Sequence, residues 1–172
     1  MINLSAPISI VWEITNNCNY KCPHCRAYKK FVKDDESIEY LIINELIESK
    51  VLLVNLSGGE PLLNPRIFKI AKRLFMENIY VVLSTNGYYY SKFRKEIIDA
   101  GIKFIQVSLD GKEELHDKFR GIKGAYDKAV EALLMAKEDG LRTQMNVTIT
   151  SDNVNNLEWN YHKAKELGCD NV

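Results

Sequence analysis

The sequence predicts an α/β domain whose parallel strands form part of a barrel. Three observations support this prediction. Apolar strand-like runs alternate with amphipathic helical runs along the chain, and such alternation is typical of βαβ units with right-handed crossovers. The strand-like runs are almost continuously apolar, as in parallel strands buried on both faces. Helical runs end at Gly101, Gly140 and Gly168, each directly before a strand-like run, and glycine is the usual left-handed residue after a helix.

The individual elements can be placed in order. Strands are expected at about residues 8–14, 51–56, 79–83, 102–108 and 142–149, with a sixth beginning at Asp170. Helices lie between the strands, and another covers about residues 155–167. The helix after the second strand has Ile67, Ile70 and Leu74 at helical spacing. Its start is predicted at Asn64-Pro65, because asparagine caps helices and proline suits the first helical position.

These elements make five βα units and the beginning of a sixth strand. The predicted fold is therefore a partial (βα)6-type TIM barrel with parallel strands, truncated at the sixth strand. A complete eight-unit barrel needs about 250 residues, whereas this chain has 172. An unpaired apolar edge strand promotes association, so we expect a partner chain or a further part of the protein to cover this edge.

Composition and charge narrow the functional classes. The chain is 46% apolar and 27% charged, with 23 basic and 23 acidic side chains. These values are typical of one soluble globular domain and disfavour disorder. They also disfavour a nucleic-acid or acidic-membrane binder, because no broad positive field is expected. The amino-terminal sequence lacks a signal-peptide pattern and the apolar runs are too short to span a membrane, so we expect a cytoplasmic protein.

The cysteines predict a metal site. Cys18, Cys22 and Cys25 lie close together, whereas Cys169 is near the other end of the sequence. Clustered thiolates select iron–sulfur clusters, zinc or cuprous copper. Zinc would need His24 or a remote residue as a further ligand, and His24 lies between two of the cysteines, where joining the same tetrahedron is strained. Three thiolates on a four-iron cluster leave one iron open, and buried inert thiols are the remaining alternative.

Polar and glycine-containing segments follow the predicted strands. Ligands of parallel α/β folds bind at the carboxyl ends of the strands, so these segments predict a cofactor site at one rim of the sheet. The segments are Thr15–Cys25, Ser57–Pro61, Ser84–Gly87, Ser108–Gly111 and Thr148–Thr150.

Two of these segments resemble the motifs of the radical S-adenosylmethionine (radical SAM) superfamily. They are Cys18-x3-Cys22-x2-Cys25 after the first strand and Gly58-Gly59-Glu60-Pro61 after the second. Three further segments resemble the branch of peptide- and haem-modifying enzymes that often carry a SPASM domain: Ser84-Thr85-Asn86-Gly87, Ser108-Leu109-Asp110-Gly111 and His116-Asp117-Lys118-Phe119-Arg120-Gly121. The resemblance runs from about residue 8 to residue 172. It implies that residues 1–172 form the core domain, with the carboxy-terminal part missing or supplied elsewhere.

The resemblance implies a 4Fe–4S cluster and S-adenosylmethionine as cofactors. Cys18, Cys22 and Cys25 would each bind one iron, and the amino and carboxylate groups of S-adenosylmethionine would chelate the fourth. The carbonyl groups of Gly58 and Gly59 would accept hydrogen bonds from the methionyl ammonium. Glu60 would support this turn or add negative charge near the ammonium; a solvated turn acid is the alternative.

Further cofactor contacts follow from the same resemblance. Arg120 matches the position that pairs with the methionyl carboxylate, with a surface arginine as the alternative. Ser108 matches a ribose-contacting hydroxyl that Asp110 would support, although Asp-Gly is also common in ordinary turns. His24 fills the usual aromatic position beside the adenine. Ser84, Asn86 and Thr148 are expected to line the same site.

The implied activity is reductive cleavage of S-adenosylmethionine to a 5′-deoxyadenosyl radical, which abstracts hydrogen from a substrate. The electron would come from a flavodoxin- or ferredoxin-like one-electron reductant, and the cluster would be oxygen-sensitive. We expect the substrate to be a peptide or protein. The alternatives are the same chemistry on a tetrapyrrole or small metabolite, and a non-catalytic iron–sulfur or zinc-binding partner subunit. The sequence does not identify a side chain that acts on the substrate.

Overall fold

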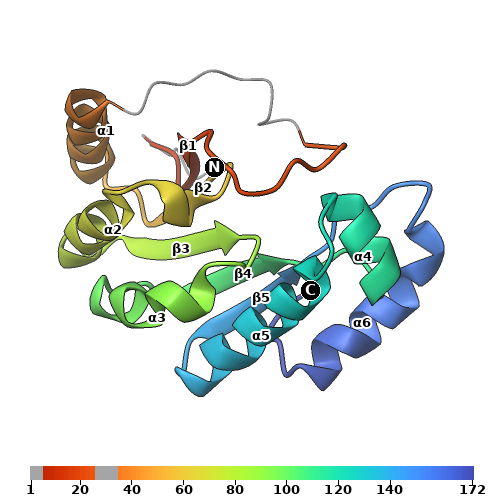
Figure 1. The fold of residues 1–172 in the computed structure, drawn as a ribbon. Helices are drawn as coiled ribbons and strands as arrows, with labels where there is room; N and C mark the ends of the chain where they lie inside the picture. Colours follow the sequence, from red (N-terminus) through yellow and green to blue (C-terminus); the bar gives the residue numbers. More distant parts are fainter. Residues whose placement is uncertain (1–5, 26–34) are drawn as a thin grey trace, which may run out of the picture.

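The computed structural model describes residues 6–25 and 35–172 of the chain. Five parallel strands form one sheet in the order β1-β2-β3-β4-β5 (Figure 1). The strands are β1 (Ser9–Thr15), β2 (Leu53–Gly58), β3 (Tyr80–Thr85), β4 (Phe104–Ser108) and β5 (Arg142–Asn146). The helices are α1 (Glu36–Glu48), α2 (Ile67–Met76), α3 (Tyr90–Asp99), α4 (Glu113–Arg120), α5 (Ala125–Glu138) and α6 (Leu157–Glu166). Two 3-10 turns, η2 (Pro61–Leu63) and η3 (Val154–Asn156), complete the described elements.

The sheet is an open partial barrel, which confirms the predicted fold class. Helices α1, α2, α3 and α5 follow one another along one side of the sheet (Figure 1). Strand residues that face these helices, such as Val54 and Leu56, are fully buried. Alternate residues, such as Asn55 and Ser57, face the other side and are half-buried, because successive side chains point to opposite faces of a strand. The sheet therefore has an apolar outer face and a more polar inner face.

The helix ends explain why each unit turns back into a strand. Gly101, Gly140 and Gly168 have the predicted positive φ angles of 80°, 71° and 66°. In the two units without a glycine, Lys50 and Asn78 take the left-handed conformation, with φ angles of 54° and 62°. Asparagine tolerates this conformation better than most residues, whereas nothing in the sequence around Lys50 predicts it.

The structure changes two predicted boundaries. The fifth strand was expected to reach residue 149, but β5 ends at Asn146, because the backbone N–H of Thr148 donates to the carboxylate of Asp110. Asn64 does not cap α2, which begins at Ile67; its Oδ1 instead accepts from the backbone N–H of Arg66 at 2.8 Å. The predicted sixth strand is represented by one parallel bridge between Gln144 and Asn171.

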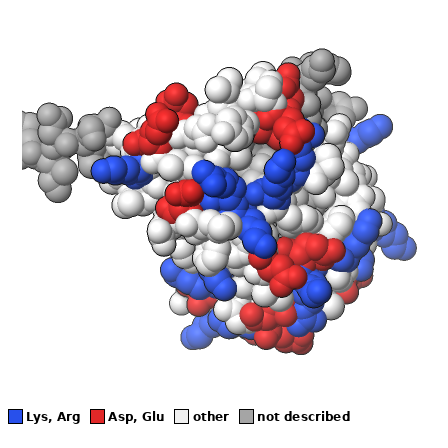
Figure 2. Space-filling model, turned by 90° about the vertical axis from the view of Figure 1, so that its left-hand side faces the viewer, with Lys and Arg blue, Asp and Glu red and all other residues white. Residues whose placement is uncertain are grey.

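Figure 2 shows the side of the molecule formed by α1 and α2, with positive and negative side chains intermixed over it. Several of them are paired across the two helices, including Lys69 with Glu36 at 3.0 Å and Arg66 with Glu39. Within the described residues, no helix has the length and apolar character needed to cross a bilayer.

Candidate active site

The three clustered cysteines lie in the segment that follows β1, at the carboxyl end of the sheet (Figure 1). All three are free and partly buried. The backbone N–H of Cys25 donates to the carbonyl of Cys22 at 3.0 Å, and the N–H of Tyr20 donates to Sγ of Cys18 at 3.4 Å. Burial raises the pKa of Cys18 and of Cys22. Cys22 and Cys25 are thus held in one turn, and without a bound metal Cys18 and Cys22 favour the thiol form.

The glycine motif packs directly on this cysteine-bearing segment. The N–H of Gly59 donates to the carbonyl of Thr15 and the N–H of Glu60 donates to the carbonyl of Asn17, both at 2.7 Å. A Cβ on Gly58 would lie 2.2 Å from the Thr15 carbonyl oxygen, and a Cβ on Gly59 would lie 2.3 Å from that of Asn17. The predicted close approach is therefore a contact with the protein's own backbone. The predicted contact of the glycine carbonyls with an ammonium group stays a prediction.

Glu60 is fully buried, so the alternative of a solvated turn acid is wrong. Its carboxylate accepts from the backbone N–H of Asn86 at 2.8 Å and of Leu62 at 3.2 Å, and from the hydroxyl of Thr85 at 2.8 Å. Burial nevertheless raises the pKa of Glu60 to about 7. Glu60 thus joins the turn after β2 to the turn after β3.

Asn86 connects the third strand end to the cysteines. Its Nδ2 donates to Oδ1 of Asn19 at 2.8 Å and lies 3.9 Å from Sγ of Cys18, within hydrogen-bonding reach of a sulfur acceptor. Its Oδ1 accepts from the N–H of Tyr88 at 2.9 Å, which fixes the orientation of the amide. The structure therefore brings Asn86 to the cysteine-bearing segment, and its predicted place in the cofactor site stays a prediction.

Asp110 and Arg120 form a buried ion pair at the fourth strand end. Nε and NH2 of Arg120 lie 2.7 Å and 2.6 Å from Oδ2 of Asp110. Oδ1 accepts from the N–H of Thr148, and the carbonyl of Asp110 accepts from Nδ2 of Asn153. Although burial opposes ionisation, the contacts with His116, Arg120 and Thr148 hold the pKa of Asp110 below its usual value. Thr148 enters the site through its backbone.

Arg120 is buried, so the alternative of a surface arginine is wrong. It ends α4 and is followed by Gly121, which has a φ of 70° and lies against the carbonyl of Lys21. Burial raises the pKa of Cys22, but the guanidinium of Arg120 opposes this shift by its charge and a hydrogen bond. The helix end therefore brings a fixed positive charge to the cysteine-bearing segment.

The ring of His24, in the cysteine-bearing segment, stacks on the ring of Phe119 in α4. The ring centroids are 3.9 Å apart and the angle between the rings is 18°. Both rings line a pocket of about 400 Å³ together with Leu115, Lys118 and residues 150–152. Burial and the charge of Arg120 lower the pKa of His24. The ring is thus neutral near pH 7 and apolar in its contacts, and its predicted place beside an adenine stays a prediction.

A polar network on the inner face of the sheet was missed at the sequence level. Oε1 of Gln106 accepts from Nδ2 of Asn55 at 3.1 Å, from Oγ of Ser84 at 2.8 Å and from Nδ2 of Asn146 at 3.4 Å. The available signal was a polar residue inside four of the apolar strands: Asn55, Ser84, Gln106 and Asn146. Ser84, predicted for the cofactor site, belongs to this network. Ser108 lies beside it, because it pairs with Asn146 across β4 and β5.

The described residues fit an iron–sulfur cluster by their donor chemistry. Three soft thiols share one turn, and buried polar atoms of that turn have no hydrogen-bond partner among the described residues: Nδ2 of Asn19, Oη of Tyr20 and Nδ1 of His24. Within residues 6–25 and 35–172, no three His, Cys, Asp or Glu side chains are grouped so as to hold a single metal ion.

Comparison with known proteins gives the family. The sequence pattern of the Radical SAM superfamily matches residues 12–163. The AdoMet-dependent heme synthase of Methanosarcina barkeri is 33% identical, over 96% of this chain and 49% of its own length. The PqqA peptide cyclase of Gluconobacter oxydans is 30% identical, over 98% of this chain and 49% of its own length. The chain therefore spans about half the length of the curated relatives it matches.

The fold has solved counterparts. The structure of Streptococcus suis SuiB bound to S-adenosylmethionine matches 96% of this chain and 40% of that chain, with a TM-score of 0.82 at 18% sequence identity. At this identity the likeness shows the fold alone, a partial barrel. The 4Fe–4S cluster and S-adenosylmethionine are the cofactors of the family that matches. On the family match and the two sequence relatives, this chain belongs to the radical SAM superfamily.

Proposed function

We propose that residues 1–172 are the core domain of an enzyme that binds a 4Fe–4S cluster through Cys18, Cys22 and Cys25 and uses S-adenosylmethionine. The observation that carries this proposal is the packing of the cysteine-bearing segment on the glycine turn at the carboxyl end of the sheet. When bound, the reduced cluster supplies the electron that cleaves S-adenosylmethionine to methionine and a 5′-deoxyadenosyl radical able to remove a hydrogen atom from a substrate.

The chain's own residues position the ligands and tune the sulfurs. The N–H of Tyr20 and Nδ2 of Asn86 are directed at Sγ of Cys18, and the charge of Arg120 lies beside Cys22. Donors and positive charge stabilise a thiolate relative to a thiol. The Tyr20 and Arg120 contacts therefore oppose in part the burial that raises the pKa of both cysteines.

The remaining predicted contacts surround S-adenosylmethionine in this proposal. The carbonyl groups of Gly58 and Gly59 accept from its ammonium group, and Arg120 binds its carboxylate with donors that Asp110 keeps oriented. Ser108 contacts the ribose, and His24 packs against the adenine. Glu60 does not contact S-adenosylmethionine in this proposal but supports the glycine turn, because its carboxylate is occupied by backbone donors and does not reach the surface.

The inner face of the sheet is the proposed substrate surface. Its amide side chains, those of Asn55, Gln106, Gln144 and Asn146, suit a substrate rich in hydrogen-bonding groups, and we propose a peptide or protein. A relative of similar identity is named as a peptide cyclase. The relative at 33% identity is named as a heme synthase, which favours a tetrapyrrole as the second candidate.

The proposal also includes the compartment and the electron donor. Three closely spaced free thiols are typical of a reducing compartment, so we place the protein in the cytoplasm. The electron would come from a flavodoxin- or ferredoxin-like reductant.

Anaerobic reconstitution with iron and sulfide tests the core of the proposal. We expect about four irons per chain, as for one cubane cluster, and formation of 5′-deoxyadenosine when dithionite and S-adenosylmethionine are added. Cys22→Ala should abolish both, whereas the matched control Cys169→Ala should retain both. Stoichiometric zinc without cluster absorbance would support the partner-subunit alternative instead. Soret-band titration with an iron coproporphyrin separates the substrate candidates, because tight binding would favour the tetrapyrrole.

A further inference from the structure

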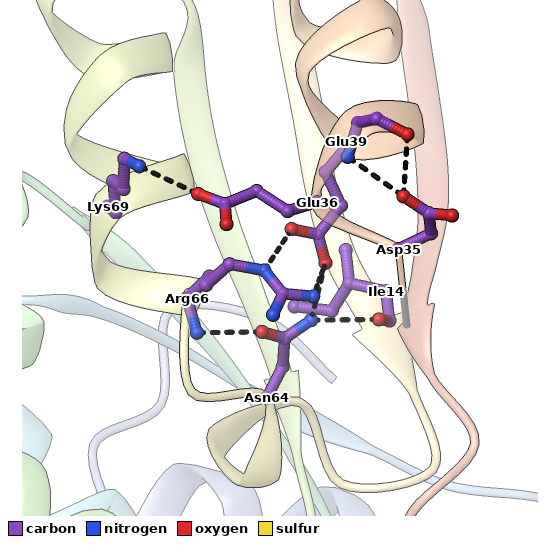
Figure 3. Close-up of polar contacts among 8 residues, drawn as sticks. Ile14, Asp35, Glu36, Glu39, Asn64, Arg66 and Lys69 are labelled. Atoms are coloured by element: carbon purple, nitrogen blue, oxygen red, sulfur yellow. Dashed lines mark hydrogen bonds and ion pairs between the residues drawn. The ribbon is translucent and has the colours of Figure 1, made fainter. Parts of the chain in front are cut away.

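One buried asparagine, Asn64, joins β1, which leads into the cysteine-bearing segment, to helix α1. The segment leaves the sheet at the end of β1, and the described chain resumes at α1. Nδ2 of Asn64 donates to the carbonyl of Ile14 on β1 at 2.9 Å and to Oε1 of Glu39 on α1 at 3.1 Å (Figure 3). Both amide hydrogens are therefore used, one on the strand that leads into the cysteine-bearing segment and one on α1.

The orientation of the Asn64 amide is fixed by its other neighbours. Oδ1 accepts from the backbone N–H of Arg66, so the NH2 group must face Ile14 and Glu39. Glu39 is in turn held by the guanidinium of Arg66, with Nε 2.5 Å from Oε2 and NH2 2.9 Å from Oε1 (Figure 3). Only 1% of Asn64 and 6% of Glu39 is exposed.

The charge of Glu39 strengthens this arrangement. Burial opposes ionisation, but the hydrogen bonds from Arg66 and Asn64 hold the pKa of Glu39 below its usual value. Asn64 therefore donates to a buried carboxylate, and hydrogen bonds to ionised groups are stronger than neutral ones. The neighbouring pair of Glu36 and Lys69 is exposed, and such pairs contribute little.

Asn64 also belongs to a larger contact surface. The stretch from Gly59 to Asn64 donates three hydrogen bonds to the start of the cysteine-bearing segment: Gly59 to the carbonyl of Thr15, Glu60 to that of Asn17, and Asn64 to that of Ile14. The first two bonds hold the segment beside its cysteines, and the third holds its base. Loss of the base would let the segment move away from the glycine turn.

We propose that Asn64 is a positioning residue that fixes the base of the cysteine-bearing segment, so that the three thiols are arranged before any metal binds. The arrangement of these thiols as cluster ligands rests on the proposed function. The clasp itself, defined as Ile14, Glu39, Asn64 and Arg66, does not. Its effect on the apo-protein and its effect on a bound cluster can therefore be measured separately.

Asn64→Asp is the test variant, because it keeps the size and the acceptor for Arg66 but replaces both donors by an oxygen. Hydrogen exchange of the apo-protein, followed at the amides of Gly59 and Glu60, reports whether the segment lifts off the glycine turn. We expect exchange there to be roughly tenfold faster, as for the loss of hydrogen bonds to a buried charge. Reconstituted Asn64→Asp should also lose iron to a chelator roughly tenfold faster, because ligand spacing is less constrained.

Asp139→Asn is the matched control. Asp139 is a buried carboxylate held by Arg94 and Tyr90 between α3 and α5, away from the cysteines. It should lower the overall stability without accelerating exchange at Gly59 and Glu60. The double variant Asn64→Asp/Glu39→Gln relieves the repulsion between residues 64 and 39 but still offers no donor to the carbonyl of Ile14, so exchange at Gly59 and Glu60 should stay faster than in the unmodified protein. It replaces Asn64→Asp as the test variant should the latter not fold.

Unchanged exchange in Asn64→Asp, or equal acceleration in Asp139→Asn, would overturn the clasp. Absence of a cluster in the unmodified protein would instead overturn the proposed function, while leaving the exchange experiment valid. The two failures are therefore distinguishable.

Discussion

Replacement of Glu60 by glutamine should change how stability depends on pH. Glu60 is fully buried among donors: two backbone N–H groups and the hydroxyl of Thr85. Burial outweighs these donors and raises its pKa from 4.5 to about 7. The folded protein therefore binds more protons than the unfolded chain between these pH values. The free energy of unfolding should fall as pH rises, by about 3 kcal/mol in total once Glu60 is fully ionised.

Glutamine cannot ionise, so the variant lacks this decrease. Its NH2 group must, however, replace one acceptor oxygen and face the N–H of either Leu62 or Asn86. One backbone donor then loses its partner, at a cost of about 1–3 kcal/mol. A protonated carboxyl group keeps lone pairs on both oxygens. We therefore expect the wild type to be more stable at pH 5 and the difference to vanish or reverse by pH 8.

Urea unfolding of the apo-protein at several pH values, followed by the fluorescence of Trp12 and Trp159, measures this difference. Glu77→Gln, which removes a carboxylate paired with Arg73 near the surface, controls for the loss of one charge. A difference between wild type and Glu60→Gln that stays constant or widens from pH 5 to pH 8 would refute the reasoning. It would mean that the backbone donors outweigh burial and keep Glu60 ionised throughout.

Further predictions concern the ion pair and the glycine turn. Arg120→Ala leaves Asp110 buried without its counter-charge and should lower the free energy of unfolding at pH 7 by about 3 kcal/mol; a smaller loss in Arg120→Ala/Asp110→Asn, measured by urea unfolding, would confirm the cause. The loss should shrink as pH falls, because Asp110 has a lowered pKa and its stabilisation disappears on protonation. Gly59→Ala should cost about 1–3 kcal/mol, because its Cβ would meet the carbonyl of Asn17. Gly140→Ala, where no atom lies within 4 Å, should cost only about 1 kcal/mol of backbone strain, and equal losses would contradict the packing argument.

The sequence was sufficient for the order and type of the strands and helices, because their periodicity is local. The glycine stops show this: the φ angles at Gly101, Gly140 and Gly168 match the prediction. The cysteines and the strand-end segments were also placed at one rim, because carboxyl ends of parallel strands share an edge. Boundaries were less accurate where a tertiary contact ended an element, as the bond between Thr148 and Asp110 does for β5.

Long-range partners were outside the reach of local patterns. Asn64 was interpreted as a helix cap because proline follows it, yet its partners Ile14 and Glu39 are 50 and 25 residues away. Glu60 was expected to support the glycine turn or to add charge near the ammonium, but its enclosing partners Thr85 and Asn86, 25 and 26 residues away, were not foreseen. In both cases the residue was singled out and its distant partners were missed, because those partners depend on which strands become neighbours.

The polar residues on the inner face of the sheet also depend on which strands become neighbours. Taking an amide out of water costs free energy unless it is hydrogen-bonded, and the register brings the half-buried amides of Asn55, Gln106 and Asn146 together so that they bond one another. Oε1 of Gln106 is occupied by donors from β2, β3 and β5, whereas its Nε2 has no partner among the described residues. The two N–H groups of Gln106 are therefore left unused by the network on the inner face of the sheet. A substrate that places a carbonyl or carboxylate oxygen there gains hydrogen bonds without the cost of reorganising the surface.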